Sequence, residues 1–476
     1  MSRSPAVGLS STSDPRRRSP LPTLATPKAF DSARPAPPLY QKILYPANGT
    51  PATPPRILHS SAHSTLDPLI LDLIALSLRA FVTPWYNGGI SRDPDKDFLQ
   101  AVTAILIHVI QALEVRLATI DWTELLLRDL PALMEDHYRD WDLANEKAGG
   151  SSAHNLSTEE MFHHLEPHIA ISLVGGAPRV DPVYMRTLVD HLLKLLLPPE
   201  DYRAETERAI VREVLVGVVF GSVFGKVAQP WFSHGVVAKL IEGREADKLA
   251  RTKRTSLETG TTPSSPSILD QIVSIVARLP GIAISTLSSL SNFFISANAT
   301  HPPSHDPYSP PLHSNVFSLI LAILPRSTTL SQLVHFASLP LSLISRTLDA
   351  YFYRTVTTSL TTEQTLKTVL EGITRGMFPN DGWPAEKDPD PDAEGQQELK
   401  QRCEAAIARL LPNKASLFFF PPNEAPSETE KDPSLLLARR LIRPFSSHVA
   451  NVHLFVLVLD LLIGKLFPEL IVTPEE

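Results

Sequence analysis

Cysteine is almost absent from this sequence, because Cys403 is the only one among 476 residues. A single thiol excludes an intramolecular disulfide and a cysteine-based zinc cluster, and such usage fits a reducing compartment. Cys403 lies in a segment rich in Glu, Lys and Arg, and no catalytic partner stands near it in the sequence. We interpret it as a packing or surface residue.

Long apolar runs are also missing. No apolar segment of the signal-peptide kind follows Met1. The densest apolar run, 214–225, is shorter than the roughly 20 residues that a membrane helix needs. The uncharged stretch 279–300 contains many Ser and Thr hydroxyl groups, which are unfavourable in lipid. The sequence therefore predicts no membrane-spanning helix.

Motifs for catalysis and for phosphate binding are lacking as well. There is no glycine-rich phosphate loop and no dinucleotide-binding fingerprint. The run Gly221–Gly225 places Ser222 one position away from the nucleophile pattern Gly-x-Ser-x-Gly, and no strand precedes it. A net charge of −7 gives no basic field for nucleic acid. We expect no enzyme, no cofactor and no nucleic-acid partner.

A short histidine cluster invites a metal hypothesis. His164 and His168 are four residues apart, with His163 and Glu166 beside them. Pro167 lies between the two histidines and disturbs the helix that would align them. We therefore expect no metal site and assign His168 to a hydrogen bond at the start of a following helix.

Helical periodicity dominates what remains. Hydrophobic residues make up 43% of the chain, enough for a large core, and alternating strand patterns are poor. The fold class is predicted to be all-α, with a Pro/Ser-rich disordered N-terminus over residues 1–62. Asp121 is a plausible N-cap with Glu124 three residues on, and Thr83-Pro84 is predicted to end the first helix. Helices are predicted at 95–119, 121–146, 183–197, 201–225, 230–242, 315–324, 330–338, 341–359, 363–372 and 449–466.

Proline and charge divide the chain into regions. We predict a domain over 63–243, a linker over 244–266, a helical region over 267–372 and a C-terminal region over 373–476. An apolar stripe from Ile272 to Ala297 has two interpretations that stay open: it packs on the core or a cavity wall, or it lies in a membrane interface.

Residues 66–242 contain an ordered series of short motifs that resembles the PX-associated (PXA) domain of large sorting nexins. The motifs are Trp85-Tyr86, Phe98, Arg116, Ile120-Asp121, His137-Tyr138-Arg139, His168-Ile169-Ala170, Tyr184-Met185-Arg186, Leu192 to Pro198, Arg212 to Leu215 and Gln229-Pro230-Trp231. The resemblance marks Trp85, Tyr86, His168, Tyr184 and Pro230 as structural positions of that family.

The tail resembles the nexin C-terminal domain of the same proteins. The motifs are Gly382-Trp383-Pro384, Leu410-Leu411-Pro412, Asn451 to Leu454, Leu459 to Leu462 and Leu466 to Leu470. Neither a PX domain nor a regulator-of-G-protein-signalling domain is recognised between the two regions, and the membrane hairpin of the larger relatives is not recognised either.

The resemblance implies that the two regions pack together around an apolar channel suited to lipid. We therefore expect a non-catalytic protein of membrane trafficking that binds or transfers phospholipid or phosphoinositide. Its expected place is the cytoplasmic face of endomembranes (endoplasmic reticulum, endosome or vacuole), where it is peripheral. The alternative is a helical scaffold that tethers organelles or protein partners.

Two sets of residues are candidates for lipid contact. Cavity-wall candidates lie in the two most apolar helical segments and are Val214, Val218, Phe220, Phe224, Leu454, Leu457 and Leu461. Membrane-surface candidates are the basic residues Arg244, Lys248, Arg251, Lys253 and Arg254, although Glu245 and Asp247 are interspersed among them.

Overall fold

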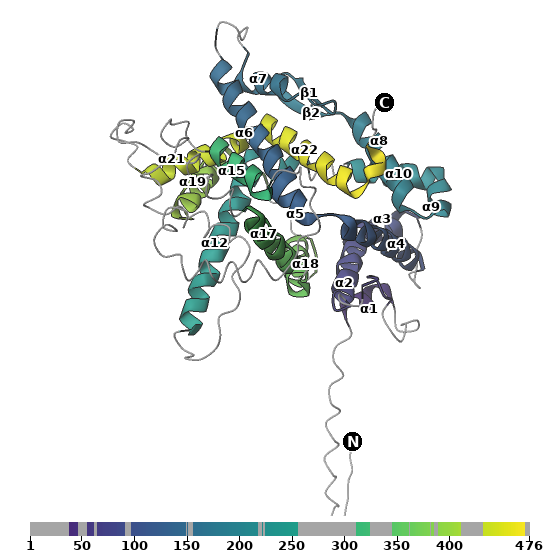
Figure 1. The fold of residues 1–476 in the computed structure, drawn as a ribbon. Helices are drawn as coiled ribbons and strands as arrows, with labels where there is room; N and C mark the ends of the chain where they lie inside the picture. Colours follow the sequence, from purple (N-terminus) through teal and green to yellow (C-terminus); the bar gives the residue numbers. More distant parts are fainter. Residues whose placement is uncertain are drawn as a thin grey trace, which may run out of the picture.

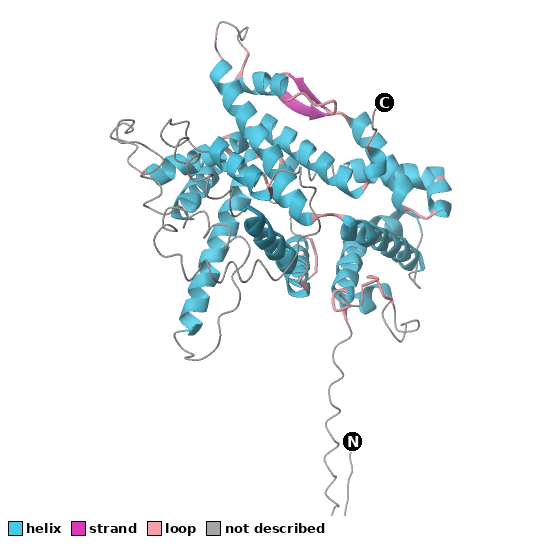
Figure 2. Cartoon of the chain, viewed as in Figure 1, coloured by secondary structure: helices cyan, strands magenta, loops and turns pink. Residues whose placement is uncertain are grey.

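The protein is described from a computed structural model. The structure describes residues 38–45, 55–60, 64–90, 97–148, 150, 156–217, 221, 224–255, 311–323, 345–360, 362–380, 382–384, 389–410 and 432–471. Within these ranges the fold is helical, as predicted, apart from one small hairpin, which is magenta in Figure 2. The stripe Ile272–Ala297 lies outside the described residues.

The N-terminal half contains these elements (Figure 1): α1 (Leu39–Leu44), α2 (Asp67–Ser77), α3 (Thr83–Trp85), α4 (Asp97–Thr119), α5 (Trp122–Glu124), α6 (Leu130–Lys147), α7 (Thr158–Leu165), β1 (Ile171–Val174), β2 (Ala177–Val180), α8 (Pro182–Leu196), α9 (Pro199–Arg203), α10 (Glu205–Leu215), α11 (Gly225–Val227) and α12 (Pro230–Thr255). The C-terminal half contains α15 (Leu312–Ile323), α17 (Ser345–Leu360), α18 (Glu363–Met377), α19 (Ala393–Leu410), α21 (Pro433–Ile442) and α22 (His448–Leu466).

Local sequence explains several helix ends. Asp121 is the N-cap of α5, as predicted, and its carboxylate accepts from the backbone N–H groups of Thr123 and Glu124. Ser157 and Glu160 form a full capping box at α7, which the sequence interpretation had missed. The Ser447 side chain caps α22 by accepting from the backbone N–H of Ala450.

The prediction that Thr83-Pro84 ends the first helix is wrong. The helical backbone passes through a wide π-turn at Leu78–Val82 and continues through α3. Proline lacks a backbone N–H, and it follows directly after the π-turn, where the Thr83 N–H bonds to the Leu78 carbonyl five residues back. Proline therefore marks a change of helix type at this place and not an end.

Two further segments differ from the sequence expectations. Within the predicted disordered tail, the structure describes α1 and residues 55–60, and Tyr40, Leu44 and Ile57 are buried against α2. Helix α12 continues to Thr255, past the expected start of a linker at residue 244. Both segments have too few periodic apolar residues to be recognised, and tertiary packing orders the first of them.

The hairpin β1–β2 was also missed. Ile171 pairs with Val180 and Val174 with Ala177, around the two-residue turn Gly175-Gly176. Both glycines have positive φ, which is what a tight hairpin turn of this kind requires. A Gly-Gly pair between short apolar runs was therefore the available signal.

Helix α22 runs through the middle of the molecule (Figure 1) and joins the two halves of the chain. It contacts α6, α7, β2 and α4, all of which come from the first half. Most of its first half is buried, including Val449, Ala450, Val452 and Val456. The C-terminal helix is therefore part of the core of the N-terminal domain, which confirms the predicted packing of the two regions.

Three helical stretches of the described chain are long and apolar enough to cross a membrane, judged by length and composition alone. They are Asp67–Gly89, Asp97–Thr119 and His448–Leu466. The expectation of no membrane span rested on the shortness of the apolar runs, but the helices are longer than those runs. In this structure α22 is enclosed by protein over its first half, whereas α4 buries only Leu99 and Thr103 completely.

Candidate functional site

The contact surface between α22 and helices α6 and α7, called the seam below, has an aromatic centre at Phe162. This ring is fully buried and meets His137, Trp141 and His453 edge-on, at centroid distances of 5.2, 5.5 and 5.5 Å. Such edge-to-face arrangements are the preferred geometry of aromatic pairs. The seam is therefore closely packed core.

Asp460 on α22 receives two hydrogen bonds from the N-terminal domain. His168 Nε2 lies 2.8 Å from one carboxylate oxygen, and the Tyr184 hydroxyl donates to the other over 2.9 Å. The His168 Nδ1 atom accepts from the backbone N–H of Ala170, so the ring proton is on Nε2 and is donated to Asp460. Burial, followed by the hydrogen bond to Asp460, raises the pKa of Tyr184 to about 12.

His168 and Tyr184 thus hold the C-terminal tail against the N-terminal domain. For His168 the sequence had predicted a different hydrogen bond. The element after His168 is a strand and not a helix, so the expected hydrogen bond at a helix start is absent and the contact to Asp460 takes its place. Asp460 itself was among the quoted tail residues, yet its partner lies 292 residues away in the sequence. No local pattern carries such a pairing.

Arg116 ties α4 to the end of the chain. Its guanidinium donates to the Leu466 carbonyl over 3.0 Å, pairs with Glu469 at 2.7 Å and lies 4.5 Å from the centre of the Phe467 ring. Two motifs that were recognised separately, one in each half of the chain, therefore meet in space.

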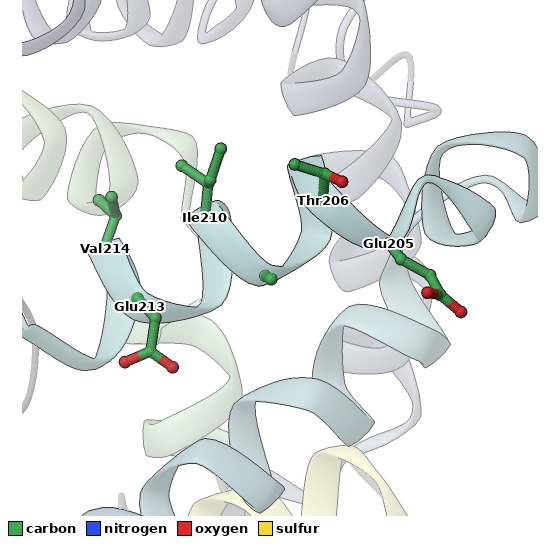
Figure 3. Close-up of a pocket in the computed structure, with 6 residues that line it drawn as sticks. Glu205, Thr206, Ile210, Glu213 and Val214 are labelled. Atoms are coloured by element: carbon green, nitrogen blue, oxygen red, sulfur yellow. The ribbon is translucent and has the colours of Figure 1, made fainter.

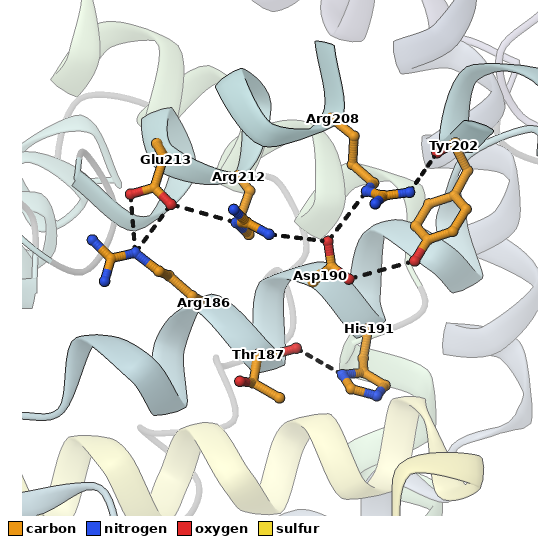
Figure 4. A network of polar contacts seen from close by, with 8 residues as sticks. All are labelled: Arg186, Thr187, Asp190, His191, Tyr202, Arg208, Arg212 and Glu213. Carbon is orange, nitrogen blue, oxygen red and sulfur yellow. Dashed lines mark hydrogen bonds and ion pairs between the residues drawn. The ribbon is translucent and has the colours of Figure 1, made fainter. Parts of the chain in front are cut away.

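Helix α10 has an unusual orientation. Figure 4 shows its polar side bonded to α8: Arg186 Nε donates to both carboxylate oxygens of Glu213 at 3.0 Å, and Arg208 and Arg212 pair with Asp190 at 3.3 and 3.5 Å. The Tyr202 hydroxyl from α9 also donates to Asp190. The charged side of α10 is therefore the side that holds it to the protein.

The apolar side of α10 faces outwards. Figure 3 shows Thr206, Ile210 and Val214 pointing to one side of the helix and Glu213 to the other. Ile210 and Val214 are 58% and 55% exposed, and they line a shallow hollow that α10 alone borders and that is open to solvent.

Helices α4 and α18 also leave apolar sides uncovered, and together with that of α10 these are called the open faces below. On α4 the exposed apolar residues are Val115 and Leu117, and the large apolar residues between Phe98 and Leu113 are mostly half-buried. On α18 the exposed apolar residues are Leu366, Val369, Ile373 and Met377. Exposed apolar patches of this kind mark interaction or ligand surfaces.

The cavity-wall candidates separate into three groups. Val214 lies on the open face of α10, and Val218 and Phe220 lie outside the described residues. Phe224 packs edge-on against Phe455, 6.0 Å between centroids, inside a buried cluster. Leu454 is buried, and Leu457 and Leu461 are half-buried on the second half of α22.

The other candidates are placed as follows. Tyr86 stacks on Phe98 with 3.9 Å between ring centroids, and Pro230 begins α12. The backbone of α3 contains Trp85, whose side chain is outside the described part. Arg244 is half-buried on α12, and Lys248, Arg251, Lys253 and Arg254 continue the same helix, without described side chains.

The histidine and cysteine hypotheses have clear structural outcomes. His163 Nδ1 lies 3.0 Å from His453 Nε2, and His168 is bonded to Asp460. Within the described residues, no group of three or more His, Cys, Asp or Glu side chains is arranged to bind a metal ion. Cys403 is buried, and burial raises the pKa of its thiol to about 11, which keeps it protonated and unreactive.

Comparison with known proteins agrees with the motif series. Residues 63–240 match the PXA domain family. PXA domain protein 1 of Schizosaccharomyces pombe is 30% identical over 161 residues, which is 33% of this chain and 30% of that protein. Human sorting nexin-13 is 24% identical over 184 residues (37% of this chain, 19% of that protein), and mouse sorting nexin-19 is 25% identical over 223 residues (46% and 21%).

The chain therefore spans less than a third of the length of each of these relatives. No solved structure matches it. The resemblance of the tail to the nexin C-terminal domain stays a prediction. Residues 63–240 match the PXA domain family that the motifs predicted, and over this region the chain is similar to the sorting nexins.

Proposed function

We propose that this protein binds lipid acyl chains on its open faces and serves membrane trafficking at the cytoplasmic surface of endomembranes, without catalysis. The observation that carries the proposal is the orientation of α10, which binds the protein through Arg208 and Arg212 and presents Ile210 and Val214 to the outside. A helix in water has the opposite preference, because uncovered apolar surface costs about 25 cal/mol per Å².

The neighbouring elements extend the apolar surface. Helix α8, which holds α10, contacts α4, and α4 contacts the second half of α22, where Leu457 and Leu461 are half-buried. An acyl chain on such a surface gains about 0.8 kcal/mol for each CH₂ group that is buried. Phospholipid or phosphoinositide is thus the proposed ligand, and the names of the relatives support a trafficking role.

The projecting end of α12 suits a membrane surface. Glu242 and Glu245 pair with Arg402 and Arg409 of α19, so these two acidic residues are already neutralised. Beyond Glu245 the helix contains one acidic residue, Asp247, and four basic residues, which are Lys248, Arg251, Lys253 and Arg254. Each such cation near an anionic membrane contributes on the order of 1 kcal/mol.

Mass spectrometry of organic extracts from the purified chain tests the proposal. We expect about one phospholipid per protein in the wild type and a loss of most of it in the double variant Ile210→Asp/Val214→Asp. Val183→Asp is the matched control, because Val183 is 63% exposed on α8 and lies outside the hollow. A folded wild-type protein without lipid contradicts lipid binding and favours the alternative, a scaffold that tethers protein partners.

A further inference from the structure

His453 occupies an unfavourable place for a charge. Its ring is completely buried in the seam, its Nε2 lies 3.0 Å from Nδ1 of His163, and its Nδ1 has no hydrogen-bond partner. Two neutral imidazoles share this contact well, because one nitrogen donates and the other accepts. If both rings carry a second proton, two N–H groups face each other and the contact is lost.

The groups around His453 supply no counter-charge. Its titratable neighbours are histidines: His163 on α7, with His164 beside it, His137 on α6, and His168 after α7. On α22 itself, His448 is close to Glu159 of α7 and to Gln229.

The nearest carboxylates already have partners. Glu166 lies 3.3 Å from Nδ1 of His137, and Asp140 of α6 is near both of these residues. Asp460 accepts from His168 and Tyr184, and Glu159 accepts from Ser447. None of these carboxylates forms a hydrogen bond with His453 in the described part of the chain, so a proton that enters there gains no direct counter-ion.

The second half of α22 responds differently to acid. His168 donates to the Asp460 carboxylate through Nε2, so a second proton on Nδ1 would remove the hydrogen bond from Ala170 but would keep the contact with Asp460. Acidification therefore acts against the contact at His453 and not against the contact at Asp460, two turns further along the same helix.

From this geometry we propose that the His163–His453 contact is a pH-sensitive switch. Protonation of the two rings releases the first half of α22 from α7, while the hydrogen bonds to Asp460 keep the second half bound. The proposal does not rest on lipid binding. The direction of the pKa agrees with it, because burial, and then the neighbouring histidines, lower the pKa of His453 to about 3. With an unfolded value of about 6.5, the neutral closed form is favoured above pH 6.5, and this preference is lost as the pH falls from there towards 3.

Thiol protection measures the release directly. Ala450 is completely buried one turn before His453 and packs in the cluster of Phe162. Ala450→Cys, made with Cys403→Ala, introduces a thiol there, and 4,4′-dithiodipyridine labels thiols at acid as well as neutral pH. The labelling rate at each pH is divided by the rate for the same protein in denaturant. Cys403 in the His234→Asn chain, buried among α12, α19 and α21, reports opening of the whole protein, because this change removes the buried histidine of that packing.

We expect the protection of the introduced thiol to fall roughly 25-fold between pH 7 and pH 5, while Cys403 stays protected. His453→Gln and His163→Gln, each made in the Ala450→Cys background, should reduce the fall to less than about threefold, because the amide does not titrate. His191→Gln is the control, since His191 is exposed on α8 and bonds to Thr187. Equal protection at both pH values, an equal fall in all variants, or a fall of Cys403 in step with the introduced thiol would each overturn the proposal.

Discussion

The seam and the open faces use similar helices in opposite ways. In the seam, α22 buries Val449 and Ala450 in the cluster of Phe162, and its His453 contacts His163 of α7. On the open faces, α10 turns its charged side inwards and exposes Ile210 and Val214. Both regions belong to one connected body, because α22 contacts α4, α4 contacts α8, and α8 contacts α10.

The difference indicates which surface is available to the proposed lipid. Apolar surface that the protein needs for its own stability is covered, as in the seam. On α10, ion pairs hold an apolar surface towards the solvent. Its exposure to water costs free energy, and a molecule that covers this surface removes that cost. Substitutions in the seam should therefore lower the stability of the protein, and substitutions on the open faces should reduce lipid binding.

The largest effect is expected from the centre of the seam. Phe162→Ala leaves a cavity between His137, Trp141 and His453, and it should lower the free energy of unfolding by about 3–5 kcal/mol. Chemical denaturation followed by circular dichroism measures this loss. Phe81→Ala is the matched control, because Phe81 is 56% exposed and should cost less than half as much. Equal losses would remove the distinction between the two regions.

The contact at Asp460 should have the next largest effect. Asp460→Ala leaves the Tyr184 hydroxyl and His168 Nε2 without their acceptor and should cost about 1.5–3 kcal/mol of unfolding free energy. Glu207→Ala, at an exposed position of α10, is the control. In the Tyr184→Phe background the loss from Asp460→Ala should be smaller, and strict additivity of the two changes would contradict the contact.

Acid should weaken the packing between α12 and the tail at another histidine. His234 is buried beside Ser446, and burial, followed by the charge of Lys400, lowers its pKa to about 4. Its contribution to stability is complete above its unfolded value near 6.5 and is lost as the pH falls towards 4, with a loss of about 2 kcal/mol at pH 5. In His234→Asn, denaturation midpoints between pH 7 and pH 5 should depend less on pH. An unchanged pH dependence would contradict the assignment.

The smallest effect on stability is expected on the open face of α10. Ile210→Ser should change the free energy of unfolding by less than about 0.5 kcal/mol, because the side chain contacts little. The same variant should reduce the amount of phospholipid that co-purifies. A large loss of stability would show that Ile210 belongs to a packed core.

The sequence was sufficient for what is periodic or locally capped. The helices, the cap at Asp121 and the order of the PXA motifs could be predicted because each depends on residues within a few positions of one another. The pairs Arg116–Glu469 and His168–Asp460 could not, because each joins residues about 300 or more positions apart. The orientation of α10 was also out of reach: its amphipathic pattern is the same whether the apolar side faces the core or the outside.

A photoactivatable phospholipid tests the central distinction most directly. The purified chain is mixed with liposomes that contain a phospholipid with a photoreactive acyl chain, irradiated, digested and mapped by mass spectrometry. We predict cross-links on the open faces of α4, α10 and α18 and on the second half of α22, at residues such as Ile210, Val369 and Leu461, and none on α7 or on His448–His453. Cross-links concentrated in the seam, or a folded protein that acquires none, would contradict the account.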